Sequence, residues 1–146
     1  KKEKMTHISP TTGQEISCVM KGVDEIYLKR NNTLNPIIID ILKQEKFNVL
    51  KTLTYQFEPQ GFTTLILLSE SHVAIHTYPE HDALYFSIYS CRGPDDSERT
   101  FQLLREKLNP REFTFLNSNK IPLLSEMRKI IISPIQKKKK NSNRQF

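Results

Sequence analysis

The 146-residue sequence is poor in the features that mark several specialised classes of protein. Its two cysteines, Cys18 and Cys91, are too few for a disulfide framework, so we expect free thiols in a reducing, cytoplasmic compartment. No apolar run approaches the roughly 20 residues that cross a bilayer, and no apolar segment like that of a secretory signal follows the lysine-rich start. We also find no internal repeat. With hydrophobic residues at 37% and charged residues at 26%, the sequence predicts a soluble globular domain without membrane contact.

Acidic residues are scarce at the two ends of the chain, and this explains the net charge of +6. Eight of the 22 basic residues lie there, namely Lys1, Lys2, Lys4, residues 137–140 and Arg144. Between residues 5 and 136 there are 14 basic and 15 acidic residues, a net charge of −1. Because such lysine runs are typically solvated and no nucleic-acid motif accompanies them, we expect no nucleic-acid partner. The pattern predicts one domain, residues 1–136, followed by a basic disordered tail, residues 137–146.

Helical and alternating apolar periodicities occur along the same chain and predict a mixed domain. Asn35-Pro36 is typical of a helix start and Asn109-Pro110 of a helix end, while residues 31–35 indicate a turn. Residues 62–68 are almost continuously apolar, which predicts a central strand buried on both faces. Helices are expected over residues 35–47 and 98–108, and the other strands over residues 14–23, 47–57, 71–78, 83–91 and 112–116.

Strands joined by short turns, with two helices inserted among them, indicate an α+β fold. We predict a two-layer sandwich in which an antiparallel sheet carries helices on one face. The other face of the sheet is also expected to be rich in apolar residues. It is therefore a candidate surface for a homodimer.

The stretch from Leu68 to Glu80 sets two serines, two histidines and two carboxylates in an otherwise apolar, β-branched run. Polar side chains in such a run are costly unless each finds a partner. If residues 71–78 and 83–91 pair symmetrically about His81, then Ser71 lies opposite Cys91. His76 has the opposite parity to Ser71, so a regular strand directs these two side chains to different faces. This stretch is the candidate site.

Three interpretations of this stretch compete on the residues alone. His72 and His76 are spaced like ligands on a helix face, but the context is a strand and the HExxH pattern is absent, so no metal site is predicted. Cys91 and His76 could form a hydrolase dyad, although no helix N-terminus is available to lower the pKa of the thiol. A core histidine and a structural cysteine would be ordinary for either residue alone. Only the combination of residues favours chemistry.

A known family shares this combination. Three segments carry the resemblance: Ser69-Glu70-Ser71-His72, then Ile75-His76-Thr77-Tyr78-Pro79-Glu80, then Cys91. They resemble the pyruvoyl-dependent S-adenosylmethionine decarboxylase family of bacterial and archaeal type, over about residues 13–116 in element order, with a motif core at residues 61–91. The resemblance implies that the protein cuts its own Glu70-Ser71 bond, which yields chains 1–70 and 71–146. The Ser71 hydroxyl would convert the preceding amide to an ester, whose elimination and hydrolysis leave a pyruvoyl cofactor.

The resemblance also implies roles for individual residues. His76 would transfer protons during processing, because imidazole titrates near neutrality, and Thr63 would replace an assisting serine hydroxyl. The pyruvoyl ketone would form a Schiff base with a small-molecule substrate and accept the electrons released with CO2, while Cys91 would be the proton donor. The implied activity is that of a carboxy-lyase that converts S-adenosylmethionine to the aminopropyl donor for spermidine synthesis. The implied assembly is a homodimer of cleaved protomers.

The sequence departs from the family pattern around the expected pocket. Ser87 stands where the family usually has an aspartate, and Glu15 and Val19 stand where its first strand carries a histidine and an acidic residue. Phe57 keeps the pattern and could either stack on an adenine or belong to the core. One alternative is therefore an ornithine or arginine decarboxylase of the same fold, in which Glu15 or Glu58 meets the distal cation of the substrate. Another is a non-catalytic homologue that regulates an active partner.

Overall fold

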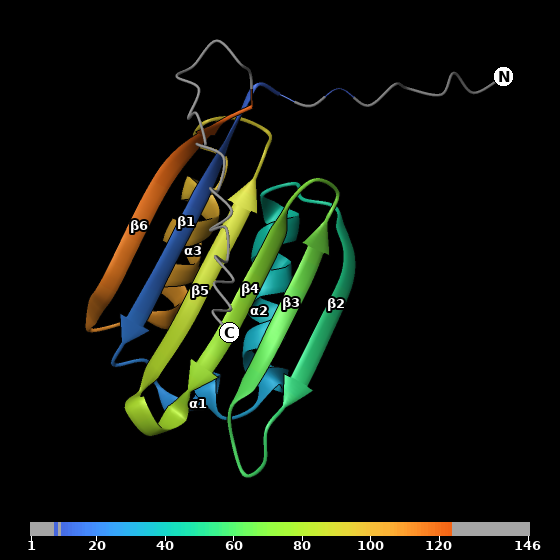
Figure 1. The fold of residues 1–146 in the computed structure, drawn as a ribbon. Helices are drawn as coiled ribbons and strands as arrows, with labels where there is room; N and C mark the ends of the chain where they lie inside the picture. Colours follow the sequence, from blue (N-terminus) through green and yellow to red (C-terminus); the bar gives the residue numbers. More distant parts are fainter. Residues whose placement is uncertain (1–7, 9, 124–146) are drawn as a thin grey trace, which may run out of the picture.

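The computed structural model describes residue 8 and residues 10–123. The predicted basic tail, residues 137–146, lies outside the described residues. Figure 1 shows the elements, which in chain order are β1 (Thr12–Lys21), α1 (Glu25–Leu28), α2 (Asn31–Gln44), β2 (Val49–Gln56), β3 (Phe62–Leu68), β4 (His72–Tyr78), a 3-10 turn (Pro79–His81), β5 (Ala83–Ser90), α3 (Glu98–Leu108) and β6 (Glu112–Pro122).

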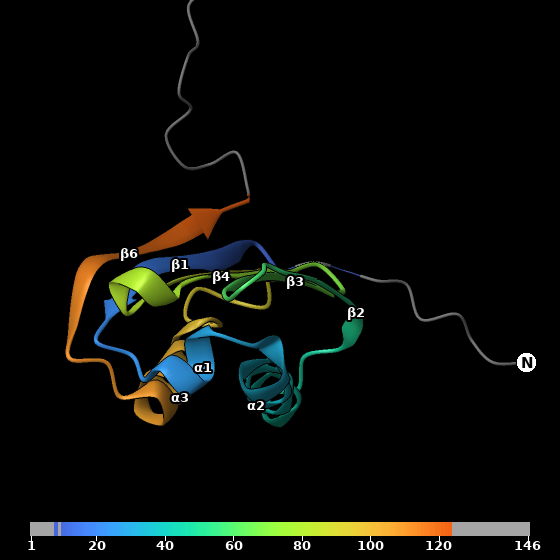
Figure 2. The same cartoon turned by 90° about the horizontal axis from the view of Figure 1, so that it is seen from below.

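The six strands form one antiparallel sheet in the order β2-β3-β4-β5-β1-β6. Strands β2 to β5 follow one another as hairpins, whereas β1 inserts between β5 and β6. Figure 2 shows α1, α2 and α3 together on one face of this sheet, and within the described residues no helix covers the other face. The predicted α+β fold, an antiparallel sheet with helices on one face, is confirmed.

The hydrophobic core lies between the sheet and the helices. Helix α2 buries residues at positions 34, 38, 41 and 42, and α3 at positions 101, 104 and 108, which is the spacing of one helix face. In β3, Phe62 and Ile66 are fully covered, whereas Leu65 and Leu67 are 48% and 52% exposed. The prediction that residues 62–68 are buried on both faces is therefore wrong for the single chain. The helices cover only one side, so alternate residues of the strand reach the surface.

The surface of the sheet opposite the helices is called the open face here. Strand registers align its side chains in rows that cross the sheet from β6 to β2. Its exposed leucines lie on β2 and β3, whereas β1, β5 and β6 carry most of its polar residues together with the exposed Phe115. The three rows are Asn119-Glu15-Tyr89-His72-Leu67-Lys51, Asn117-Ser17-Ser87-Ala74-Leu65-Leu53 and Phe115-Val19-Tyr85-His76-Thr63-Tyr55.

Helix α2 begins at Asn31, four residues before the predicted start at Asn35, so the prediction of a turn at residues 31–35 is wrong. The helix ends at Gln44, three residues before the predicted end at 47, and Pro36 lies inside it. The first turn of α2 is capped by Gln56, the last residue of β2. The Gln56 side-chain oxygen accepts hydrogen bonds from the backbone N–H of Asn31, at 3.2 Å, and from the Asn31 side-chain Nδ2, at 2.9 Å. The Gln56 amide nitrogen in turn donates to the carbonyl of Lys29, at 2.9 Å. Because this cap comes from a residue distant in sequence, local start signals could not locate it.

We expect Gln56→Ala to lower the free energy of unfolding by about 1–3 kcal/mol, since it leaves part-buried donors and acceptors at the start of α2 without partners. Chemical denaturation measures this change. The control is Gln44→Ala, which removes only an exposed hydrogen bond to Asp40 within the same helix and should change stability by less than about 0.5 kcal/mol. Equal effects of the two substitutions would show that Gln56 is not the cap.

The remaining boundaries differ modestly from expectation. Helix α3 and strand β3 have the predicted limits, whereas β1, β2 and β5 are displaced or shortened by one or two residues at their ends. Strand β6 continues to Pro122, well past the predicted end at 116, because it pairs with the whole of β1. The short helix α1 was not predicted; the Asp24 side chain caps it by accepting from the N–H of Ile26 at 3.0 Å. Ser97 does not cap α3 with its side chain, which instead donates to the carbonyl of Gln14 at 3.1 Å.

Candidate active site

The β4–β5 hairpin sets the geometry of the predicted cleavage site. The ladder ends with His72 opposite Tyr89. Continued outward, this register sets Cys91 opposite the residue before Ser71, so the predicted pairing of Ser71 with Cys91 is wrong by one residue. The cause is the connection between the strands, which has four residues and therefore places the symmetry point just before His81 rather than at it.

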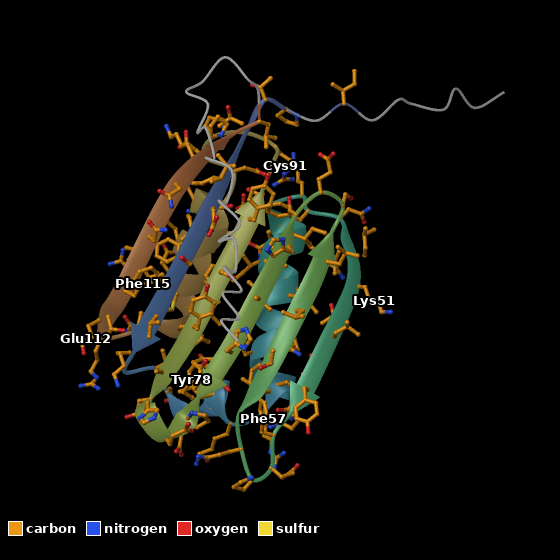
Figure 3. The ribbon with its side chains drawn as sticks, in the orientation of Figure 1. Lys51, Phe57, Tyr78, Cys91, Glu112 and Phe115 are labelled. Atoms are coloured by element: carbon orange, nitrogen blue, oxygen red, sulfur yellow. The ribbon has the colours of Figure 1, made fainter. Side chains whose placement is uncertain are left out.

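Glu70 and Ser71 lie in the tight turn between β3 and β4, where the N–H of Leu68 donates to the carbonyl of Ser71 at 2.9 Å. Ser71 is only 6% exposed. Cys91 directly follows β5 and reaches this turn. Figure 3 shows Cys91 at the upper end of the sheet. Its thiol donates toward the carbonyl oxygen of Glu70 at 3.4 Å and toward Oε2 of the same residue at 3.1 Å. The thiol therefore contacts the carbonyl of the bond that the sequence predicts to be cut.

The environment of Cys91 keeps its thiol protonated. Burial is the largest cause that raises the pKa of Cys91, and the hydrogen bond with the Glu70 carboxylate raises it further. A hydrogen bond with the Ser71 side chain lowers the pKa, and the charges of Glu70 and Asp96 raise it again. A protonated thiol near neutral pH suits a proton donor and not a thiolate nucleophile. The environment thus disfavours the hydrolase dyad.

Thr63 and His76 form a second group on the open face. They are direct partners in the β3–β4 ladder, and the Thr63 hydroxyl lies 3.1 Å from Nδ1 of His76. The ring of Tyr85 packs beside the imidazole, with 5.8 Å between the ring centroids. The hydroxyl and the tyrosine ring hold the imidazole in a partly buried position, where it can exchange protons with a group placed above the sheet.

The two groups lie apart within one chain. Five residues of extended strand separate Ser71 from His76, a distance of about 16 Å. Ser71 is buried beside the turn, whereas His76 belongs to the open face, as the parity of the sequence predicted. The structure therefore brings Glu70, Ser71 and Cys91 together, and Thr63 and His76 together, but does not bring one set to the other.

The predicted substrate-binding residues are divided between the ends of the sheet. Phe57 is 48% exposed, lies far from Cys91 in Figure 3 and packs edge-on against Tyr55 with centroids 4.9 Å apart, so it does not belong to the core. The Glu58 carboxylate forms an ion pair with Arg30, with 3.0 Å between Oε1 and a guanidinium nitrogen. The arginine lowers the pKa of Glu58 and balances its negative charge. Glu15 lies on the open face opposite Tyr89, near the cleavage turn.

Two cavities lie near the residues of the candidate site. Next to the cleavage turn is a pocket of about 140 Å³ lined by residues 46–48, 68–71 and Arg92. An apolar groove of about 310 Å³ runs over β2, β3 and β4 on the open face, between Leu53, Leu65 and His72. Within the described part of the chain, no three histidine, cysteine or acidic side chains gather as metal ligands do, and no helix has the length and apolarity needed to span a membrane.

Sequence reasoning missed two charged residues next to the site, Arg92 and Asp96. The Arg92 guanidinium binds backbone carbonyls that are 46 and 47 residues away in the chain. An arginine directly after the candidate proton donor was visible in the sequence. Its partners were not, because they meet it only in the folded protein.

Comparisons with known proteins identify a family and agree with this fold. A family model described as S-adenosylmethionine decarboxylase matches residues 14–120. The S-adenosylmethionine decarboxylase proenzyme of Aquifex aeolicus is 31% identical over 104 residues, which are 71% of this chain and 77% of that protein. The proenzyme of Thermoplasma volcanium is 33% identical over 93 residues, 64% of this chain and 72% of that protein. The crystal structure of the Aquifex aeolicus adenosylmethionine decarboxylase superposes with a TM-score of 0.73 and 25% identity, covering 84% of this chain and all of that one.

The fold and the site define an α+β two-layer domain whose buried serine and protonated thiol meet where a sheet hairpin ends. The family model covers well over half of the sequence, and the relatives match most of their own length. The chain belongs to the S-adenosylmethionine decarboxylase family. The resemblance that the motif around Ser71 indicated is thereby confirmed.

Proposed function

We propose that this protein is a self-processing decarboxylase of S-adenosylmethionine that supplies the aminopropyl donor for spermidine synthesis. It is cut between Glu70 and Ser71 into chains 1–70 and 71–146, and Ser71 becomes its pyruvoyl group. The observation that carries the proposal is the contact of the Cys91 thiol with the Glu70 carbonyl, 3.4 Å away, beside a buried Ser71. The family membership of the chain and the names of its relatives support it. The two unpaired cysteines fit a cytoplasmic location.

In the processing step, the Ser71 hydroxyl attacks the carbonyl carbon of Glu70, and the amide nitrogen of Ser71 leaves. An ester then links the two residues. Removal of the Cα proton of Ser71 eliminates the Glu70 carboxylate, and water converts the resulting unsaturated residue to the pyruvoyl group with release of ammonia. The thiol of Cys91 is placed to donate a hydrogen bond to the carbonyl oxygen as negative charge develops there.

The residues around Ser71 fit the group that it would form. Ser71 itself is buried, with 6% of its surface exposed, and a protonated thiol lies beside it. A pyruvoyl group at residue 71 would supply a carbonyl able to take up the substrate amine and to withdraw electrons from the bond to the departing carboxylate. Cys91 then supplies the proton that replaces CO2. The exposed Phe57 ring lies at the far end of the sheet from the Ser71 of its own chain, so it could stack on the adenine of the substrate only from a partner subunit.

We further propose a homodimer in which two open faces pack together. About 16 Å of strand separates Ser71 from the His76 of its own chain, so that imidazole is out of reach. A two-fold axis near Ala74, which lies between these residues, exchanges the two ends of β4. It brings the partner subunit's His76 and the partner subunit's Thr63 toward Ser71. Half-exposed Leu53, Leu65 and Leu67 on the open face support such packing.

For the Cys91→Ala variant we expect cleavage to become slower but still occur, because one hydrogen-bond donor to the Glu70 carbonyl is lost. Turnover should fall by about 10²- to 10⁴-fold, because a positioned proton donor is lost. Intact mass reports cleavage, and release of labelled CO2 reports turnover. Cys18→Ala is the control: burial raises the pKa of Cys18 to about 12, and its thiol lies in the core. Wild-type turnover in Cys91→Ala would remove Cys91 from the reaction.

The substrate is tested by measuring labelled CO2 released from S-adenosylmethionine, ornithine and arginine in parallel. We expect release only from S-adenosylmethionine, and the pairing of Glu58 with Arg30 weighs against Glu58 as the partner of a distal substrate cation. Release from ornithine or arginine would reassign the substrate. A protein that stays uncut after prolonged incubation would instead be a non-catalytic homologue, and the proposal would fail.

A further inference from the structure

The side chain of Arg92 is used completely in joining the segment after β5 to the end of α2. Its Nε lies 2.9 and 3.1 Å from the two carboxylate oxygens of Asp96, and its terminal nitrogens donate to the carbonyls of Lys46 and Glu45, each at 3.0 Å. The guanidinium carbon is 3.7 Å from the ring centroid of Phe47. The backbone N–H of Arg92 also donates to Asp96, at 3.2 Å. A planar guanidinium can make this set of contacts, whereas an ammonium group cannot.

These contacts of Arg92, called the Arg92 clamp here, lie immediately beside the reacting groups. Arg92 follows Cys91 in the chain and lines the pocket of about 140 Å³ that Glu70 and Ser71 also line. Asp96, which Arg92 neutralises, is close enough for its charge to raise the pKa of Cys91. The strand β5 ends at Ser90, so no ladder hydrogen bond fixes residue 91. Apart from the thiol's own contacts with Glu70 and Ser71, the position of Cys91 therefore depends on what holds the next residue.

We propose that Arg92 is a positioning residue that holds the Cys91 thiol against residue 71 and so decides which carbon receives the proton that replaces CO2. This inference rests on the proposed function. Loss of CO2 leaves an electron pair that can be protonated at the α carbon of the substrate or at the carbon contributed by residue 71. A thiol that is held in place reaches the first carbon, whereas a mobile thiol does not discriminate between them.

The two outcomes leave different products. Protonation of the substrate carbon, followed by hydrolysis, releases the decarboxylated amine and restores the carbonyl of residue 71. Protonation of the residue 71 carbon, followed by hydrolysis, releases an aldehyde and leaves the substrate nitrogen on residue 71, which is then alanine. Water is the only co-reactant in both cases, and neither needs an oxidant or a reductant. An alanine at the start of chain 71–146 thus records each misplaced proton.

The first test measures thiol position without any turnover. In the Ser71→Ala background, which is not expected to be cut, alkylation by iodoacetamide reports on Cys91, because Cys18 is fully buried with a pKa of about 12. We expect Arg92→Gln to accelerate alkylation of Cys91 by about tenfold, because the thiol is released from its contacts. The matched control is Arg99→Gln, which removes an exposed arginine that also contacts Glu45, at 3.7 Å, but does not line the pocket beside the turn. Its rate should equal that of the background.

The second test counts misplaced protons during turnover. N-terminal sequencing of chain 71–146 detects alanine, whereas a pyruvoyl group blocks the reaction. Per CO2 released, we expect Arg92→Gln and Arg92→Lys to form alanine about tenfold more often than the wild type, with KM for the substrate little changed. Asp96→Asn, which removes the ionic part of the clamp, should also increase the yield of alanine per CO2 released, but by a smaller factor. Arg99→Gln should match the wild type.

The outcomes separate the two proposals. If the wild type is not cut or releases no CO2, the proposed function fails, whereas the alkylation result still decides whether Arg92 holds the thiol. If the wild type is active, unchanged alkylation or an unchanged alanine yield in the Arg92 variants overturns the inference, as does an equal increase in Arg99→Gln. Folded Arg92 and Asp96 variants that are all uncut also overturn it, because they would assign the clamp to bond cleavage instead of protonation.

Discussion

Replacing Ser71 with alanine is expected to leave the chain as a single 146-residue polypeptide. Without the hydroxyl, only the protonated Cys91 thiol lies beside the Glu70 carbonyl, and the ester that precedes bond breakage cannot form. Intact mass spectrometry after prolonged incubation measures the result directly. In the wild type we expect two species, chains 1–70 and 71–146, and in Ser71→Ala only the uncut chain. The effect is therefore complete loss of cleavage.

The neighbouring serine provides the matched control. Ser69 lies in the same turn, where its hydroxyl meets Nδ2 of Asn48 at 3.5 Å, and it precedes the scissile bond by one residue. Ser69→Ala should be cut at the wild-type site. Cleavage of Ser71→Ala at the same bond, or an uncut Ser69→Ala that is folded, would contradict the assignment of Ser71 as the nucleophile.

Replacing His76 with alanine is also expected to stop cleavage, and a second subunit should restore it. The proposed dimer places His76 of one subunit near Ser71 of the other. In a mixed dimer of His76→Ala and Ser71→Ala chains, the His76→Ala chain keeps its own Ser71 and receives the imidazole from its partner. We expect that chain to be cut in mixed dimers and to stay uncut in dimers of His76→Ala alone.

Co-expression of the two variants with different tags, followed by intact mass of each chain, measures this complementation. His72→Ala is the discriminating control, since His72 is the imidazole adjacent to Ser71 and contacts Tyr89, with centroids 5.9 Å apart. If His72→Ala abolishes cleavage and His76→Ala does not, the base belongs to the same chain as Ser71. If the His76→Ala chain stays uncut in verified mixed dimers, the partner does not supply the proton transfer.

Much of the fold could be predicted from the sequence because it depends on local periodicity. The limits of β3 and α3 were predicted correctly, since apolar spacing and the Asn109-Pro110 stop are signals within each element. The hairpins from β2 to β5 followed from short turns. The start of α2 did not, because Gln56 caps it from the next strand. The position of β1 between β5 and β6 was also beyond local patterns.

The candidate site divides in the same way. A polar cluster in an apolar strand pointed to Glu70 and Ser71, and the parity of His76 correctly placed it on the other face of the sheet. The hairpin register came out one residue off, since loop length and not strand pattern sets it. The contact between Cys91 and the Glu70 carbonyl, and the clamp of Arg92, involve residues 21 to 47 positions apart.

The sequence by itself determined the class of fold, the order of the hairpins and the motif around Ser71 that marks the family, because periodicity, turn residues and side-chain chemistry are written along the chain. Only the tertiary structure decided which groups meet. It raised the pKa of Cys91 by burying it beside Glu70, and it left a half-apolar sheet face uncovered within the described residues. The desolvation of Cys91 and the distances between the site residues depend on residues that are remote in sequence. They are therefore set only when the sheet and the helices pack together.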